Sequence, residues 1–93
     1  MITLDSRPVP VRTVQGRQLE DEAVLVLPEK GEVKVLNTVG ARIWSLADGS
    51  RSVREIAAAI CAEYSVSTAQ AEADTLDFIQ ELVAKGIVTI RSA

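Results

Sequence analysis

The sequence has no histidine and a single cysteine, Cys61. Without histidine, a Ser–His or Cys–His pair for nucleophilic catalysis is excluded, and most zinc, haem and copper sites lose their usual ligands. One cysteine cannot form an internal disulfide, so nothing indicates an oxidising compartment. These absences predict no metal, no cofactor and no catalytic activity, and they favour a protein that acts by binding.

Long apolar runs and excess positive charge are also lacking. The longest uninterrupted apolar stretch is the seven residues 56–62, whereas a membrane span needs about 20. The first residues, MITLD, lack the basic flank and apolar segment of a signal peptide. The net charge is −3, so bulk attraction to nucleic acid or to an anionic membrane is not expected. We therefore predict a cytoplasmic protein that binds neither nucleic acid nor membrane.

The remaining composition is that of one small globular domain. The chain has 93 residues, of which 47% are hydrophobic and 25% charged, and a typical domain has about 100–150 residues. Within it, we expect an N-terminal arm and edge strand over residues 1–21 and the main folded part over residues 22–93.

The first third of the chain has the patterns of β-strands. Residues 9–13 alternate apolar and polar side chains but contain a proline, which favours an edge strand or an ordered arm. Gly16 is interpreted as a turn. The continuous apolar run 23–27 predicts a strand covered on both faces. Residues 28–31, PEKG, favour a tight turn, so residues 32–36 complete a β-hairpin.

From Asn37 onward the apolar periodicity is helical. Asn37 or Thr38 can cap a first short helix, which Asp48-Gly49 ends. Ser52 and Glu55 have the spacing of a capping box and open a second helix. A tight turn at 65–67 leads to a third helix, which Ser67 and Gln70 open at the same capping-box spacing and which continues to about residue 85. Residues 87–90 form a last short strand.

This order predicts an α+β fold of the winged helix-turn-helix type, with N-terminal antiparallel strands, three helices and a short C-terminal strand. Winged helices include DNA-binding and protein-binding members, so the fold alone does not assign a function. The third helix carries four carboxylates, Glu72, Asp74, Asp77 and Glu81, against one basic residue, Lys85. Because a helix that reads DNA lies among phosphates, this charge pattern argues against a DNA-binding regulator.

Two features suggest a surface for a peptide. The strand at 32–36 has one hairpin partner by chain order, so its other edge is expected to be free to pair with an extended peptide. Val33 and Val35 should point to one face of this strand, and Lys34 and Leu36 to the other. On the third helix, Phe78 lies at the margin of the apolar stripe beside charged side chains. It is either part of a groove wall or simply a core residue.

The chain also resembles a known family. The segments that carry the resemblance are LPE at 27–29, VLN at 35–37, TVGARIW at 38–44, LADG at 46–49, SVREI at 52–56, FIQEL at 78–82 and GI at 86–87. Together they are similar to the PqqD family of pyrroloquinoline quinone biosynthesis, whose fold is the peptide-binding winged helix called the RiPP recognition element. The resemblance extends over about residues 22–90.

The resemblance implies a non-catalytic chaperone that binds the leader of a ribosomally made precursor peptide and presents it to a modifying enzyme, often a radical-SAM protein. The leader would add as a strand beside residues 32–36 and pack against the third helix. Carried over to this sequence, the peptide-binding residues are Val33, Lys34, Val35 and Leu36 on the strand and Asp74, Phe78, Glu81 and Lys85 on the helix. A winged-helix DNA-binding regulator and a structural domain that forms a homodimer through the strand edge are the alternatives.

Overall fold

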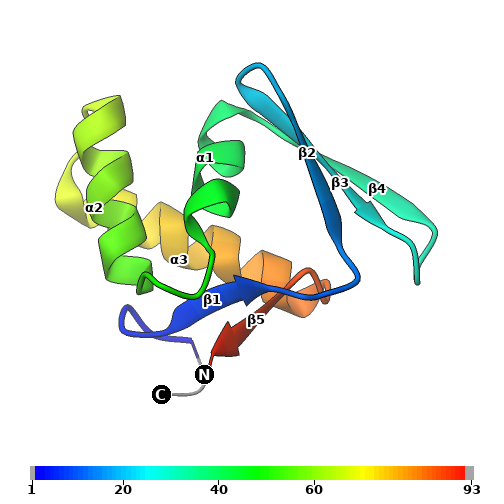
Figure 1. The fold of residues 1–93 in the computed structure, drawn as a ribbon. Coiled ribbons are helices and arrows are strands. Elements are labelled where there is room, and N and C mark those ends of the chain that lie inside the picture. The colour runs from blue at the N-terminus through cyan, green and yellow to red at the C-terminus, as the bar shows by residue number, and fades with distance from the viewer. Residues whose placement is uncertain (1, 92–93) are drawn as a thin grey trace.

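Two antiparallel sheets and three helices make up the described part of the chain, residues 2–91 of a computed structural model (Figure 1). The elements are β1 (Arg7–Pro10), β2 (Gln15–Leu19), β3 (Glu22–Leu27), β4 (Glu32–Leu36), α1 (Thr38–Leu46), α2 (Val53–Tyr64), α3 (Thr68–Ala84) and β5 (Val88–Arg91). The predicted order of antiparallel strands, three helices and a short C-terminal strand is confirmed. The arrangement is compatible with a winged helix-turn-helix.

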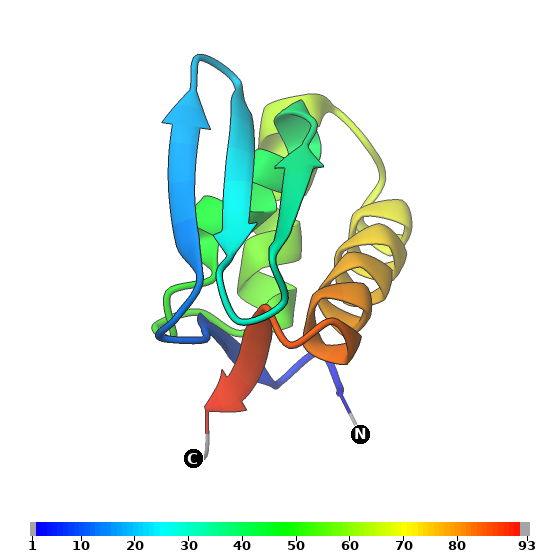
Figure 2. The same ribbon diagram turned by 90° about the vertical axis from the view of Figure 1, so that its right-hand side faces the viewer.

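The strands form one sheet of three strands and one ribbon of two. The larger sheet has the order β2–β3–β4. The ribbon pairs β1 with β5, so residues 7–10 are hydrogen-bonded to residues 88–91. The expected boundary between the N-terminal arm and the main folded part, at residues 21 and 22, falls in the turn of the β2–β3 hairpin, so β2 pairs with β3 across it. In Figure 2 the three-stranded sheet stands in front of α1, and the ribbon lies below it.

The predicted turn at Gly16 is wrong, because Gly16 lies inside β2 opposite Leu25. The strand has the polar sequence QGRQL and is exposed along its whole length, so it has no apolar periodicity. It forms by pairing with β3. The first strand is also displaced from the predicted residues 9–13: β1 ends at Pro10, and the turn falls at residues 12–13.

The prediction that both faces of residues 23–27 are covered is also wrong. In β3 the side chains of Ala23, Leu25 and Leu27 are buried, whereas Val24 is half-buried and Val26 is 38% exposed. Successive side chains of a strand point to opposite faces. Since α1 packs on one face of the sheet, the other face is left open to solvent.

The helices begin at the predicted caps. The Asn37 side chain accepts a hydrogen bond from the Gly40 amide at the start of α1, and the Ser67 hydroxyl accepts one from the Gln70 amide at the start of α3. Ser52 and Glu55 form the complete capping box of α2, with side chain and backbone bonded in both directions. The predicted capping interactions within the second helix are therefore confirmed.

The first turn of α2 is also bonded to the N-terminal segment. The amides of Val53 and Arg54 donate to the carbonyl oxygens of Ser6 and Leu4, at 2.9 and 2.8 Å. Amides in the first turn of a helix have no partner within the helix. Residues 4–6 therefore complete the hydrogen bonding of α2 and hold β1 in place beneath it.

The core lies between the sheet and the helices and includes Leu25, Ile56, Ile79, Leu82 and Ile87, each fully or almost fully buried. The inner face of the sheet and the buried side of α3 contribute to the same cluster. Burial of α3 along one side therefore sets its distance from β4. Among residues 2–91, none of the helices combines the length and apolarity needed to cross a bilayer.

Candidate functional site

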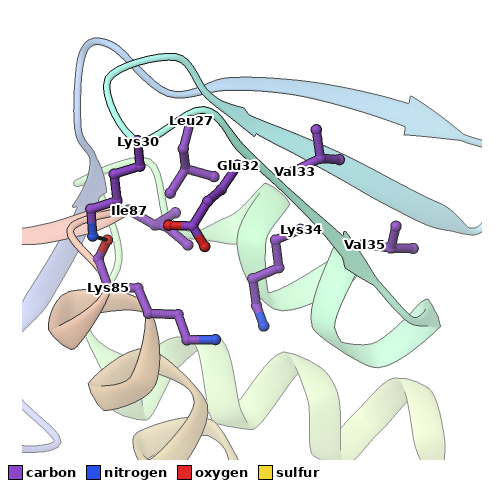
Figure 3. Close-up of a pocket in the computed structure, with 8 residues that line it drawn as sticks. All are labelled: Leu27, Lys30, Glu32, Val33, Lys34, Val35, Lys85 and Ile87. Atoms are coloured by element: carbon purple, nitrogen blue, oxygen red, sulfur yellow. Dashed lines mark hydrogen bonds between the residues drawn. The ribbon is translucent and has the colours of Figure 1, made fainter.

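A groove separates the free edge of β4 from α3. In Figure 2, β4 lies between β3 and α3, and within the described residues β4 pairs only with β3. We call this the β4–α3 groove. It is lined by Leu27, Lys30, Glu32, Val33, Lys34, Val35, Lys85 and Ile87 (Figure 3).

The side chains of β4 alternate as the sequence predicts. Leu36 is 2% exposed and faces the core, and Lys34 shares its face of the strand and points toward α3 (Figure 3). Val33 and Val35 point the other way and are each 63% exposed. They stand opposite Val26 and Val24 of β3. The outer face of the sheet therefore carries four valines beside the unpaired edge.

Two polar contacts connect β4 and its preceding turn to α3. The Lys34 ammonium lies 3.5 Å from a carboxylate oxygen of Glu81, and Lys34 is the more buried partner. The Lys30 ammonium donates to the backbone carbonyl of Lys85. This carbonyl belongs to the C-cap of α3, and a cation there satisfies a carbonyl at the negative end of the helix dipole. The two contacts link β4 and its preceding turn to α3 across the groove.

Farther along α3, a shallow hollow continues the groove. It is lined by Asp74, Asp77, Phe78 and Glu81. The Asp74 carboxylate accepts a hydrogen bond of 2.8 Å from Gln70, one turn earlier. Phe78 and Asp74 also border a small hollow beside the start of α1. We call the surface formed by Asp74, Asp77 and Glu81 the acidic shelf.

Phe78 belongs to both the core and the surface. Its ring is half-buried and packs against the hydrophobic core, yet it lines both hollows on α3. A Cβ built on Gly40 would lie 3.1 Å from Cζ of Phe78, so the absence of a side chain in α1 leaves room for the ring. The two interpretations drawn from the sequence are therefore compatible with each other.

The structure brings most of the predicted site residues together. Val33, Lys34, Val35 and Lys85 line the β4–α3 groove, while Asp74, Phe78 and Glu81 line the adjoining hollow. The exception is the Leu36 side chain, which is buried in the core and leaves only the backbone for a ligand. The assignment of these residues to peptide binding stays a prediction.

Sequence reasoning missed five lining residues: Leu27, Lys30, Glu32, Asp77 and Ile87. Two of them could have been predicted from the sequence. Glu32 lies on the same face of β4 as Lys34, and Asp77 lies one helical turn from both Asp74 and Glu81. The others reach the groove only through the fold.

Among residues 2–91, β2 has no strand on its outer side, so the sheet has a second unpaired edge, which differs from β4 in composition. All five residues of β2 are exposed, and the strand is polar except for Leu19 at its end. Polar and charged side chains discourage pairing at an edge strand. Figure 2 shows β2 on the side of the sheet away from α3. Of the two edges, therefore, the one on β4 has apolar neighbours and a helix facing it, and the one on β2 does not.

The fold and the groove define a small α+β binding domain, and its relatives identify the family. Residues 22–88 match the family described as coenzyme PQQ synthesis protein D (PqqD). The chain is 35% identical over 92 residues to the PqqA binding protein of Xanthomonas axonopodis pv. citri (strain 306), covering 96% of this chain and 97% of the relative. This chain belongs to the PqqD family, as its sequence motifs suggested.

Solved structures agree with this assignment. TbiB1, in a complex with the TbiA(beta) leader peptide, is 35% identical with a TM-score of 0.82, over 91% of this chain and 99% of TbiB1. The PqqD truncation of Methylobacterium extorquens PqqCD, described as a stand-alone RiPP recognition element, is 27% identical with a TM-score of 0.77, over 96% and 95%. A lasso peptide synthetase B1 shares the fold at 23% identity and a TM-score of 0.80, over 89% and 98%.

Proposed function

We propose that this protein captures the leader of a ribosomally made precursor peptide by strand addition and presents the peptide to a modifying enzyme. The observation that carries the proposal is the unpaired edge of β4 facing α3 across a groove. Unpaired amides and carbonyls at such an edge can bond an extended peptide, and the neighbouring side chains supply selectivity. The protein would act by binding and carry out no chemistry itself.

Two relatives support a peptide as the ligand. The PqqA binding protein is named for its ligand, and TbiB1 is described with a leader peptide bound. Both are 35% identical to this chain and align with nearly all of it. The exposed carboxylates of α3 argue against the DNA-binding alternative, because phosphates would be repelled there.

In the proposed complex, β4 supplies backbone groups and α3 supplies a wall. The peptide would pair along residues 33–36, and alternate side chains would face either α3 or solvent. Those facing outward would extend the valine surface beside Val33 and Val35, where β-branched and aromatic neighbours are favourable. On α3, the residues that would contact the peptide are Asp74, Phe78, Glu81 and Lys85.

Hydrogen exchange tests the strand addition directly. The TbiA(beta) leader and PqqA are suitable first peptides, because relatives bind them. If a peptide joins β4, outward-facing backbone amides of residues 33–36 become protected, whereas those on the free edge of β2 exchange as before. Binding with protection on β2, or on neither edge, would contradict the proposal.

A proline in β4 provides the first variant prediction. Val35→Pro removes one amide from the strand that borders the groove, and proline is tolerated at edge strands better than elsewhere in a sheet. We expect a weaker peptide affinity in calorimetric titrations while circular dichroism still reports a folded domain. Unchanged affinity in the folded variant would exclude pairing through this amide. If the variant unfolds, the hydrogen-exchange experiment on the unmodified chain tests strand addition to β4 instead.

The partner enzyme is proposed to be of the radical-SAM type, and the complex to form in the cytoplasm. A radical-SAM enzyme encoded beside this protein, together with a short precursor reading frame, is the candidate to test. Size-exclusion chromatography should show the enzyme, the peptide and this protein eluting together, with less enzyme-bound peptide when this protein is omitted. Failure of the enzyme to bind the peptide-loaded protein would reject this partner.

A further inference from the structure

Charges of opposite sign occupy the two ends of the groove. At the end formed by the β3–β4 turn and the C-terminus of α3, Lys30, Lys34 and Lys85 line the groove against one carboxylate, Glu32 (Figure 3). Along α3 toward its N-terminus, the acidic shelf has three carboxylates and no basic residue among its lining side chains. The groove is therefore polarised along its length.

Contacts across the groove fix the direction of this polarity. Lys30 contacts the end of α3 and Lys34 contacts Glu81, one turn earlier, so β4 and α3 run in opposite directions. The positive end lies beside the start of β4 and the negative end beside its finish. In the middle, Lys34 and Glu81 neutralise each other. Outside this pair, a ligand meets Lys30 and Lys85 with Glu32 at one end, a net positive charge, and Asp74 and Asp77 at the other.

The distance between these charges can be expressed in residues of an extended peptide. Lys85 and Asp77 are eight residues apart on α3, which at about 1.5 Å per residue corresponds to about 12 Å. A β-strand rises about 3.3 Å per residue, so about four strand residues cover this distance. Side chains four residues apart in a strand point to the same face. The two peptide side chains opposite Lys85 and Asp77 would therefore both face α3.

We propose that the groove selects an extended peptide with one acidic and one basic side chain four residues apart, the acidic one beside Lys85 and the basic one beside the acidic shelf. This inference rests on the proposed function, since it assumes a strand added to β4. It assigns the charge pattern and register of the ligand, which strand addition alone leaves open. The order of the two charges along the peptide then gives the direction of the added strand.

A peptide array provides the test. Capped nonapeptides of alternating valine and threonine carry Glu, Lys or Ser at positions 3 and 7 in all combinations, and fluorescence polarisation measures binding at low salt. Exposed ion pairs are individually weak, so we expect a mixed Glu and Lys pair to bind about threefold to tenfold more tightly than Ser–Ser. The pairs Glu–Glu and Lys–Lys should gain less than the mixed pair.

Two charge variants make the test specific to the groove. Lys85→Glu makes both ends acidic, so the tightest ligand should become Lys–Lys, and Asp77→Lys should shift the preference toward Glu–Glu. Arg12→Glu and Glu20→Lys introduce the same charge changes at exposed positions that do not line the groove, and they should leave the ranking unchanged. Urea unfolding establishes that each variant is folded.

The possible failures are distinguishable. Equal binding of all peptides, or a ranking that Lys85→Glu and Asp77→Lys do not alter, would overturn the charge selection and leave strand addition intact. No binding by any peptide of the array, together with no amide protection in β4 by the leader peptides, would overturn the proposed function and this inference with it.

Discussion

At the scale of single residues, the close approach of Trp44 to the backbone of β2 illustrates how strongly one position is constrained. A Cβ on Gly16 would lie 2.8 Å from Nε1 of Trp44 and 3.2 Å from a methyl carbon of Leu25. Real Cβ atoms do not approach so closely, so α1 can pack on the sheet at this distance only if residue 16 is glycine. The same packing positions β4 on the opposite side of β3.

Gly16→Ala should therefore destabilise the protein. The indole must move to admit a methyl group, and overpacking of this kind typically lowers the free energy of unfolding by about 1–3 kcal/mol. Urea denaturation followed by the fluorescence of Trp44, the single tryptophan, measures both the loss and the altered environment. Gln15→Ala, an exposed position on the same strand, is the control and should cost less than about 0.5 kcal/mol.

At the scale of secondary-structure elements, several polar contacts depend on ionised carboxylates. Amide and hydroxyl hydrogen bonds from Ser52 lower the pKa of Glu55 in the capping box of α2. Hydrogen bonds from Ser50 lower the pKa of Asp48, and the Arg42 guanidinium lowers that of Glu63 while the pKa of Arg42 is raised. Each of these side chains favours the folded state when it is charged.

Stability should consequently fall in acid. A carboxyl group whose pKa is lower in the folded than in the unfolded state contributes fully above its ordinary pKa, 4.5 for Glu55, and loses the contribution as the pH falls through the folded value. Urea midpoints of the unmodified chain and of Glu55→Gln should differ at pH 7 and converge toward pH 3. A difference independent of pH would show that the Glu55 charge plays no part.

Local patterns predicted these elements better than distant pairings did. The capping box and the Ser67 cap were readable from residues three positions apart. β2 was missed because its exposed polar sequence carries no periodicity, and it becomes a strand only through β3. The exposure of Val24 and Val26 was missed because five consecutive apolar residues do not reveal which face the helices cover.

The candidate site likewise has a part that local patterns predict and a part that they do not. Most of the lining residues follow from the alternation of side chains along β4 and from the residues beside the apolar stripe of α3. The Lys34–Glu81 ion pair and the bond from Lys30 to the Lys85 carbonyl connect residues far apart in the chain. Such contacts depend on how β4 and α3 are brought together, which the spacing within either segment does not specify.

At the scale of the whole molecule, α3 limits what can reach the β4 edge. The helix stands on the open side of β4 (Figure 2), and the groove between them is lined by side chains from both. An isolated extended peptide can enter between the two elements. A second copy of the domain would bring its own α3 beside its own β4, so two helices would have to fit beside the paired strands.

We therefore expect a monomer. Light scattering should give a mass near 10.0 kDa across micromolar concentrations, with or without peptide. A dimer that dissociates when a leader peptide is added would show instead that a second copy uses the β4 edge, in favour of the homodimer alternative. The variant Val33→Lys adds charge beside that edge, so it would weaken such a dimer and leave a monomer unaffected.

The β1–β5 ribbon places Arg7 opposite Arg91, and in Figure 1 the ribbon runs along the base of the molecule, away from the turn between β2 and β3. The outer ends of β1 and β5, at Arg7 and Arg91, therefore lie beside each other. An enzyme joined through a short flexible linker to either end would hold a captured peptide at a high local concentration, about millimolar for short linkers. Gene fusion in either order is thus compatible with the same geometry, as is a fluorescent tag for measurements in cells.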